Sequence, residues 1–146
     1  MPMKMTQEER EAFLNEVHVA VISVPDPGRG PLAVPVWYAY VPQDEFHIWT
    51  GGDSHKVALL RQAGRCSICV QQETPPYKYV SVEGPVAMEP IQLERDLRPL
   101  VYRYLGPEEG QAYIEGLGVE TAGTGDLLIR VKLERWRTLD FSKYEA

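Results

Sequence analysis

The sequence predicts an antiparallel β-barrel with appended helices, built from about six strands. Stretches rich in β-branched and aromatic residues alternate between apolar and polar positions, which is typical of half-buried strands. Short turns containing proline or glycine join most of these stretches, so successive strands are expected to pair as antiparallel neighbours. Helical patterns occur only at the start, after the third strand and before the last one. The chain therefore lacks the regular strand–helix alternation that predicts a parallel sheet.

The first part of the chain predicts one helix and two strands. A helix begins at Thr6, which forms a capping box with Glu9. Residues 17–24 are rich in valine and isoleucine and end at a Pro-Asp-Pro-Gly turn, as a strand before a tight turn does. Residues 31–41 are apolar on both faces, so this second strand is expected to be covered on both sides. Pro35 cannot donate to a strand ladder and marks a sheet edge, a bulge or an opening that would admit a flat ligand.

The middle of the chain predicts three more strands and a helix. The strand at residues 46–50 leads into a glycine turn and a helix that ends at Gly64, because glycine is favoured just after a helix. Residues 65–72 form the next strand. Residues 77–89 form a long strand whose valines alternate with polar residues. Gly84 interrupts that alternation, as at a bulge or a barrel corner.

The last part of the chain predicts helical segments before a final strand. Apolar residues recur at helical spacing over residues 92–105. Pro99 must kink this segment or begin a second helix, since it lacks a backbone N–H donor. A Gly-Pro pair then ends the segment, and residues 108–117 form another short helix. Residues 126–138 alternate again and form the last strand.

The composition is that of an ordinary globular protein. Of the 146 residues, 44% are hydrophobic and 25% are charged, so we expect a single domain, residues 1–146, with a proper core. A formal net charge of −6 argues against non-specific nucleic-acid binding, which needs a basic surface. No apolar run approaches the ~20 residues of a membrane span, and the N-terminus has no signal-peptide core. We therefore expect a soluble, cytoplasmic protein that binds neither membranes nor nucleic acid.

The segment IWTGGDSHKVALL, residues 48–60, combines a strand end, two glycines and a helix start. The helix is expected to begin at Asp53 or Ser54, of which Ser54 is a favoured N-cap, and the first amides of a helix have no internal partners. Those amides, the hydroxyls of Thr50 and Ser54 and the ammonium of Lys56 would together suit a phosphate. The alternative is a plain strand-to-helix turn with a cap and a solvated lysine. The residues of this segment alone leave both interpretations open.

Cys66 and Cys69 form a C-x-x-C pair, which raises the question of redox or metal chemistry. Residues three apart on a strand point to opposite faces, so these thiols are expected to diverge and to be buried structural residues. The three histidines, His18, His47 and His55, lack the spacing of metal ligands. We therefore expect no metal site.

Three segments in register resemble the FMN-binding split-barrel superfamily, which includes pyridoxamine 5′-phosphate oxidase and flavin- or deazaflavin-dependent relatives. They are PVWYAY, IWTGGDSHKVALL and YKYVSVEGPV. The family pattern is Tyr/Trp-Thr at a strand end, then Ser-Arg-Lys or Ser-x-Lys, and later Val-x-Val-Glu-Gly. The resemblance covers about residues 10–139. It implies an antiparallel six-stranded split barrel, a homodimer with the cofactor at its interface, and bound FMN or coenzyme F-420.

The resemblance also implies which residues bind the cofactor. Those expected at its phosphate are Thr50, Ser54, His55 and Lys56. Those expected along or near its ring are Pro35, Val36, Trp37 and Trp49, with Tyr79 where the oxidases carry a glutamine, and Gln71 and Trp136 as further candidates.

The sequence also departs from the oxidases of this family. It ends at WRTLDFSKYEA without their arginine-rich segment, and His55 replaces the arginine of Ser-Arg-Lys. We therefore expect an oxidoreductase that transfers a hydride between F-420 or FMN and a small organic substrate, with no catalytic side chain identified. The alternatives are a non-catalytic flavin or F-420 carrier or sensor, and an FMN oxidase like pyridoxamine 5′-phosphate oxidase. Haem binding and hydrolysis have less support, because histidine-ligand and G-x-S-x-G motifs are absent.

Overall fold

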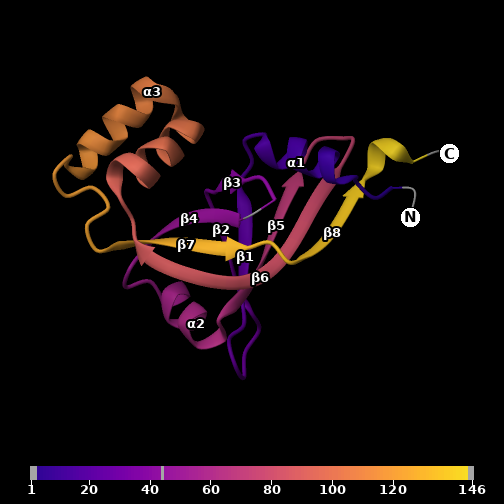
Figure 1. Cartoon of the computed structure of the whole chain (residues 1–146), viewed down its shortest axis with the longest axis horizontal. Coiled ribbons are helices and arrows are strands. Elements are labelled where there is room, and N and C mark those ends of the chain that lie inside the picture. The colour runs from indigo at the N-terminus through magenta and orange to yellow at the C-terminus, as the bar shows by residue number, and fades with distance from the viewer. Residues whose placement is uncertain (1–2, 44, 145–146) are drawn as a thin grey trace.

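Eight antiparallel strands curl around one core in the computed structural model, which describes residues 3–43 and 45–144 (Figure 1). The strands are β1 (Ala20–Val24), β2 (Leu32–Val36), β3 (Ala39–Val41), β4 (Glu45–Gly51), β5 (Arg65–Gln72), β6 (Lys78–Pro90), β7 (Asp126–Lys132) and β8 (Arg135–Asp140). The helices are α1 (Gln7–Asn15), α2 (His55–Ala63), the π-helical turn η1 (Leu93–Leu97), α3 (Arg98–Leu117) and the 3₁₀ turn η2 (Phe141–Lys143). The predicted antiparallel split barrel with appended helices is confirmed.

The strands form two sheets that share β6. Sheet A contains β2, β1, β5, the first part of β6 and β8, and sheet B contains the second part of β6, β7, β4 and β3. The change of sheet occurs at Gly84, where a Cβ atom would lie 1.8 Å from the carbonyl oxygen of Lys132. The predicted corner at Gly84 is therefore required by a close approach of two backbones.

The strand count exceeds the prediction because two predicted strands each divide between the sheets. The stretch 31–41 becomes β2, which pairs with β1, and β3, which pairs with β4. At the division, the amide of Tyr38 donates to the hydroxyl of Tyr104 (3.0 Å) instead of to a strand. The stretch 126–138 likewise becomes β7 in sheet B and β8 in sheet A. Apolar alternation continues through both divisions, so the pattern does not reveal them.

The barrel interior holds the larger of two apolar clusters. It collects the inward side chains of both sheets, and α1 adds the buried Phe13 and Leu14. The capping box that begins α1 is formed as predicted, with Thr6 and Glu9 each accepting the other's backbone N–H. The buried hydroxyl of Tyr38 donates to the carbonyl oxygen of Leu14 (2.9 Å), which fixes the end of α1 on the barrel.

The second cluster lies between the outer face of sheet B and the helical segment η1–α3. Its buried members are Ile91, Leu97, Val101, Ile114 and Leu128. The segment bends as predicted after the first half of α3, where φ at Gly106 is 80°. Figure 1 shows these helices beside the end of β6, away from α1 and α2. None of the described helices has the length and apolar composition needed to cross a membrane.

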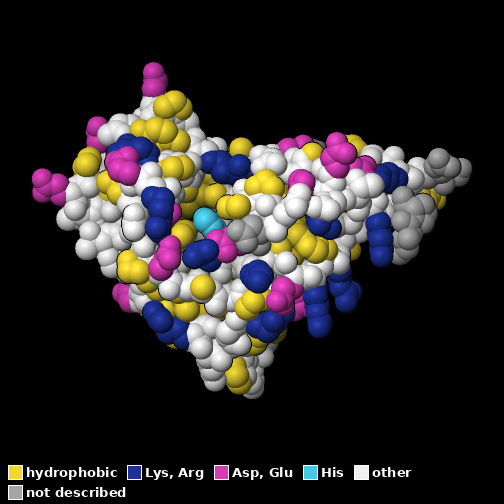
Figure 2. All heavy atoms as spheres, in the orientation of Figure 1, with side chains coloured by type: hydrophobic (Ala, Val, Ile, Leu, Met, Phe, Trp, Pro, Cys, Tyr) yellow, Lys and Arg dark blue, Asp and Glu magenta, His cyan; other side chains and the backbone are white. Residues whose placement is uncertain are grey.

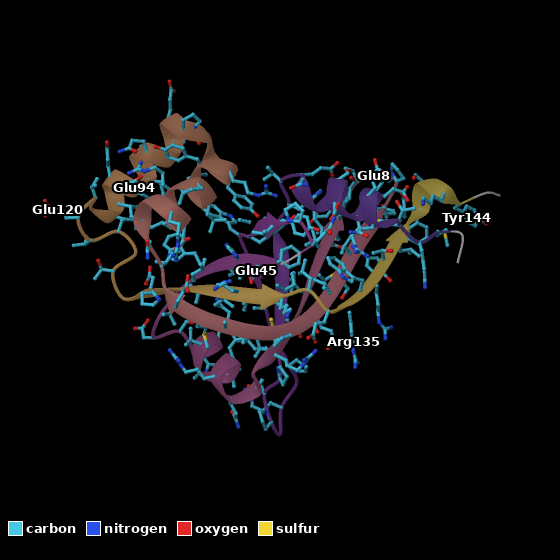
Figure 3. All side chains as sticks on the ribbon, viewed as in Figure 1. Glu8, Glu45, Glu94, Glu120, Arg135 and Tyr144 are labelled. Carbon is cyan, nitrogen blue, oxygen red and sulfur yellow. The ribbon has the colours of Figure 1, made fainter. Side chains whose placement is uncertain are left out.

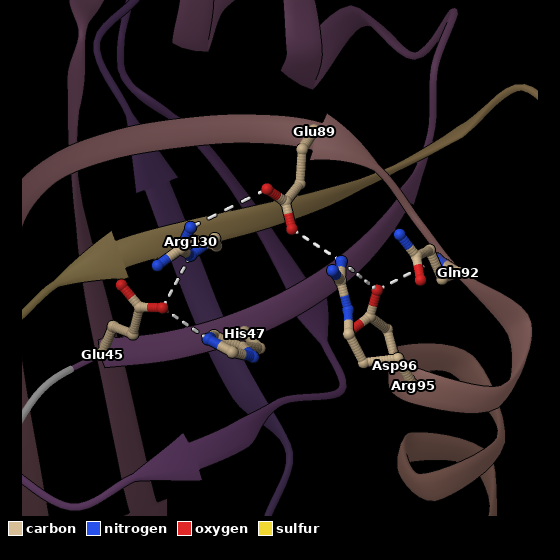
Figure 4. A network of polar contacts seen from close by, with 7 residues as sticks. All are labelled: Glu45, His47, Glu89, Gln92, Arg95, Asp96 and Arg130. Atoms are coloured by element: carbon tan, nitrogen blue, oxygen red, sulfur yellow. Dashed lines mark hydrogen bonds and ion pairs between the residues drawn. The ribbon is translucent and has the colours of Figure 1, made fainter.

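A polar network borders this second cluster (Figure 4). The buried carboxylate of Glu45 accepts hydrogen bonds from His47 Nε2 (2.6 Å) and Arg130 Nε (2.7 Å). Burial alone would raise the pKa of Glu45, but these two hydrogen bonds outweigh it and lower that pKa. Glu89 lies between Arg130 and Arg95, so the network joins β4 and β7 to η1.

The far end of the network is local to η1. Arg95 also pairs with Asp96 (2.8 Å), and Asp96 accepts the backbone N–H of Gln92 (3.0 Å). Figure 3 shows Glu45 near the centre of the molecule, whereas Glu94 lies on η1 and Glu120 on the loop after α3, both at the edge of the molecule. On the face seen in Figure 2, acidic and basic side chains are interspersed with apolar ones.

Candidate cofactor site

The turn between β4 and α2 presents two hydroxyl groups side by side. Thr50 is 6% exposed at the end of β4, and its Oγ1 lies 3.3 Å from Oγ of Ser54. Ser54 is the N-cap residue, as predicted, but no side chain caps α2. The amide of Val57 bonds the carbonyl oxygen of Ser54 (3.1 Å), whereas the amides of His55 and Lys56 lack a partner within the helix. The positive end of the helix dipole favours an anion there.

The tightness of this turn explains one of its glycines. A Cβ atom at Gly52 would lie 2.2 Å from the carbonyl oxygen of Gly125. The glycine-rich loop at residues 118–125 thus packs directly against the turn. Any larger residue at position 52 would push the loop away or distort the start of α2.

Lys56 is a half-buried cation in the first turn of α2. It forms no hydrogen bond or ion pair with the part of the chain that the structure describes. Burial lowers the pKa of the Lys56 ammonium below its usual value. A partly desolvated charge with no counterion is stabilised when an anion binds. The residues of this turn therefore fit a phosphate group.

His55 is the first residue of α2, and its side chain is 66% exposed. Its Nε2 lies 3.9 Å from Oδ2 of Asp26, which belongs to the turn between β1 and β2. This contact brings a carboxylate from a distant turn to the start of α2.

Two carboxylates also lie close to this turn. A Cβ atom at Gly51 would lie 3.5 Å from Oδ1 of Asp53 and 3.9 Å from Oδ1 of Asp126. Both carboxylates line a hollow of about 450 Å³ that also contains Arg61. Because like charges repel, these two carboxylates disfavour a phosphate in this hollow.

Helix α3 brings together the two tryptophans expected near the ring. Trp37 stacks on Tyr104, with ring centroids 4.7 Å apart and planes 5° apart. The ring centroid of Tyr113 lies 6.3 Å from that of Trp37 and 6.4 Å from that of Trp49, so Tyr113 bridges the two tryptophans. Trp49 also donates from Nε1 to Asp126 (2.8 Å).

Three other predicted residues share the outer face of sheet A. Pro35 lies opposite Val21 on β1, and Gln71 lies opposite Tyr79 on β6. Side chains that are directly opposite share a face. Pro35 and Gln71 both line a groove of about 750 Å³ on this face. Val36 points the other way, into the core.

Trp136 lies apart from these groups. It is opposite Val82, whose side chain is buried, and it packs against the core. The guanidinium of Arg10 lies 3.8 Å above its ring. The structure thus gathers the predicted residues into a phosphate-like turn, an aromatic cluster and a sheet face, and leaves Trp136 beneath α1.

The two cysteine thiols diverge as predicted. Burial raises the pKa of Cys66 to about 12, so this thiol is unreactive. The expectation that both are buried is wrong for Cys69, which is exposed on the outer face of sheet A. It faces outward on β5 and lines the groove on this face. Within the described residues, no three His, Cys, Asp or Glu side chains are arranged to hold a metal ion.

Several neighbours of the site were not found from the sequence. Asp26, Tyr104, Tyr113 and Asp126 each contact a predicted residue across a large separation in the chain. The Pro-Asp-Pro-Gly motif at residues 25–28 signals a turn and does not indicate what that turn approaches. The tyrosines of α3 stand in a clear helical pattern, but that pattern does not identify the sheet face they cover.

Comparison with known proteins places this geometry in a family. The family model described as pyridoxamine 5′-phosphate oxidase matches residues 6–140. No curated protein sequence matches the chain. A conserved hypothetical protein from Mycobacterium tuberculosis has a similar structure, with a TM-score of 0.79, 24% identity and coverage of 97% of this chain and 89% of that chain.

Two further solved structures share the fold at lower identity. An FAD-binding protein from Mesorhizobium loti gives a TM-score of 0.64 at 17% identity, covering 92% of this chain and 94% of that one. A protein described as an F420 reductase gives 0.67 at 19% identity, covering 87% and 94%. With the family model matched over nearly the whole chain, this protein belongs to the pyridoxamine 5′-phosphate oxidase family of split-barrel proteins.

Proposed function

We propose that this protein is an oxidoreductase that binds FMN or coenzyme F-420 and transfers a hydride between it and a small organic substrate. The observation that carries the proposal is Lys56, a half-buried cation in the first turn of α2 that lacks a partner among the described residues. That helix has no side-chain cap, and its N-cap residue Ser54 pairs with Thr50. Structural neighbours described as an FAD-binding protein and an F420 reductase support the class of cofactor.

The chain's own residues would bind, orient and shield the cofactor. Thr50, Ser54, His55 and Lys56 would hold its phosphate. The aromatic cluster around Trp37 and the face that carries Gln71 and Tyr79 would border its ring. When bound, the flavin or deazaflavin supplies the hydride chemistry. The candidates for proton delivery are Tyr79, His55 and solvent.

The proposal includes a homodimer with the cofactor at its interface. Val19 and Val21 are exposed beside the groove that contains Pro35 and Gln71. Exposed apolar side chains that border a groove favour a partner surface, and a second copy is the occupant that the family resemblance implies. We also propose that the enzyme acts in the cytoplasm.

The test is a titration of the protein with FMN and, separately, with F-420, followed by quenching of tryptophan fluorescence. We expect tight binding of one cofactor, weakened about tenfold or more in Lys56→Ala, since hydrogen bonds to charged groups contribute about 1.5–3 kcal/mol. Lys132→Ala is the matched control, because Lys132 is exposed at the opposite end of the β4–β7 ladder. If neither cofactor binds, or if Lys56→Ala binds as tightly as the parent, the proposal is wrong.

Turnover separates the enzyme from a carrier or sensor. The reduced cofactor, bound to the protein, is mixed with a panel of small organic acceptors, and its reoxidation is followed by absorbance under anaerobic conditions. Faster reoxidation with at least one acceptor than in free solution supports an oxidoreductase. Tight binding with reoxidation no faster than in free solution would favour a carrier.

A further inference from the structure

We propose that Tyr104 of α3 is a positioning residue for the cofactor ring, because its hydroxyl group holds two segments of the groove wall in place. The groove is the one of about 750 Å³ on the outer face of sheet A, and its wall includes His18 and Pro35. This proposal rests on the proposed function, since it concerns how the same cofactor is bound.

The hydroxyl group of Tyr104 joins α3 to two segments of the barrel. It donates to the backbone carbonyl oxygen of His18 (2.6 Å), two residues before β1. It accepts the backbone N–H of Tyr38 (3.0 Å), at the division between β2 and β3. The carbonyl oxygen of Tyr38 is farther from it (3.3 Å), so the single hydroxyl proton is assigned to the bond with His18.

The amide of Tyr38 needs a partner from outside the sheets. Tyr38 is fully buried, and it lies after the end of β2 and before the start of β3. Leaving a buried N–H unpaired is costly, so the bond to Tyr104 stabilises the course that the chain takes between the two strands. Pro35 lies three residues earlier in the chain, and the same bond therefore helps to fix the groove wall.

The contacts beside this hydroxyl act on the same two segments. The ring of Tyr104 stacks on Trp37, with centroids 4.7 Å apart and planes 5° apart. The guanidinium of Arg103 donates to the carbonyl oxygen of Glu16 (2.8 Å), directly before residues 17–19, which line the groove. One turn of α3 thus holds the groove wall of sheet A, although α3 itself packs on sheet B.

This arrangement has a consequence for binding. A wall that is already assembled in the free protein strengthens binding, because the ligand does not have to order it. The wall faces the groove that also contains Gln71, on the side of the site assigned to the ring. The hydroxyl of Tyr104 should therefore strengthen binding of the ring by the same factor whether or not the ligand carries a phosphate.

The experiment compares the parent with Tyr104→Phe and Tyr102→Phe. Tyr104→Phe removes the hydroxyl and keeps an aromatic ring to stack on Trp37. Tyr102→Phe is the matched control, because it removes a hydroxyl whose partners, Arg98 and Gln111, both belong to α3. The affinities for FMN and for riboflavin, which lacks the phosphate, are measured well below the unfolding midpoint of each protein. The circular dichroism of the bound flavin is recorded at saturation.

We expect Tyr104→Phe to bind FMN and riboflavin about threefold to tenfold more weakly than the parent, as for the loss of one hydrogen bond. The circular dichroism of its bound flavin should also change, because the ring rests on a displaced wall. Tyr102→Phe should match the parent in both measurements. Parent-like affinity in Tyr104→Phe, or a loss for FMN with none for riboflavin, would overturn the proposal.

Hydrogen exchange at the amide of Tyr38 gives a second measurement that needs no variant. Because coupling is reciprocal, a ring whose binding is strengthened by the bonds of Tyr104 must stabilise those bonds in return. We expect saturating riboflavin to slow exchange at Tyr38 about threefold to tenfold more than at Ile114, a buried residue of α3. Equal slowing at both amides, or none, would contradict the role of Tyr104.

The two proposals fail in different ways. If Lys56→Ala weakens FMN binding while Tyr104→Phe binds both flavins like the parent, the proposed function stands and the role of Tyr104 is wrong. If neither FMN nor F-420 binds the parent, the proposed function is wrong and the role of Tyr104 falls with it. If F-420 binds and FMN does not, F-420 and its phosphate-free deazaflavin replace the two flavins in every measurement.

Discussion

The two outer faces of this barrel have different coverage. The outer face of sheet B is packed beneath η1 and α3, which bury Leu97 and Leu128 in a separate apolar cluster. The outer face of sheet A keeps Val19 and Val21 exposed at 52% and 39%. It is hollowed by a groove of about 750 Å³.

This difference shows which of the two sheet faces is covered by helices of the same chain. A sheet face with apolar side chains gains stability when it is covered, because burying one such side chain contributes roughly 1.5–3 kcal/mol. Sheet B gains this within the chain, from helices that also bring Tyr104 and Tyr113 to the tryptophans. In our proposal, the exposed apolar side chains of sheet A are buried by a second copy of the chain together with the cofactor.

The largest expected effect compares one apolar residue from each face. Leu97→Ala removes a fully buried side chain, so we expect the free energy of unfolding to fall by about 2–5 kcal/mol. Val21→Ala removes an exposed side chain and should change it by less than about 0.5 kcal/mol in a monomer. Urea denaturation measures both.

The same measurement can break the comparison. If Val21→Ala costs as much as Leu97→Ala, the outer face of sheet A is buried in solution. If the loss of unfolding free energy in Val21→Ala then grows with protein concentration, a second copy of the chain buries this face. A loss of unfolding free energy that does not depend on protein concentration would show that a second copy does not bury this face.

The sequence was sufficient for local features of this fold. The capping box at Thr6 and Glu9, the left-handed glycine after α2 and the bend at Gly84 were predicted from single residues. Each depends on a backbone requirement that few residue types meet. The alternation of β6 was predicted for the same reason, because one face of the strand must be apolar.

Features that depend on distant contacts were not predictable in this way. The divisions at residues 37–38 and 133–134 follow from which sheet each half joins, while the apolar pattern is continuous. The contact between Asp26 and His55, and the cover that α3 gives to sheet B, arise only when the elements pack. Cys69 was misjudged for a related reason: strand alternation gives opposite faces but does not tell which face the chain leaves bare.

A smaller effect concerns the polar network that borders the covered face. Glu45→Gln replaces a buried carboxylate that Arg130 and His47 hold, so we expect a loss of about 1–3 kcal/mol at neutral pH. The folded-state pKa of Glu45 is lowered, so this stabilisation is present above the ordinary value of about 4.3 and is lost as the pH falls through the folded value. The gap between parent and variant should therefore close below about pH 4.

The control for this prediction is Glu94→Gln. Glu94 also pairs with an arginine, but its side chain is 73% exposed, and exposed pairs contribute little. Unfolding midpoints measured from pH 7 down to about pH 3 compare the two variants. If the difference in unfolding midpoint between the parent and Glu45→Gln stays constant with pH, lost packing and not the lost charge explains the lower stability of the variant.

The smallest expected effect tests whether Lys56 serves the fold or a ligand. Burial lowers its pKa, so folding disfavours the charged form, and this penalty applies below the folded-state pKa and fades as the pH rises toward the ordinary value. Lys56→Met should therefore stabilise the cofactor-free protein slightly at neutral pH, by no more than about 0.5 kcal/mol because the side chain is half exposed. Lys132→Met, at an exposed position, should leave the thermal midpoint unchanged.

If Lys56→Met instead lowers the midpoint clearly, the lysine stabilises the turn itself, and the turn is a strand-to-helix connection with no need of a phosphate. If the thermal midpoint of Lys56→Met stays the same or rises while cofactor binding is lost, the charge of Lys56 stabilises the cofactor complex and not the fold.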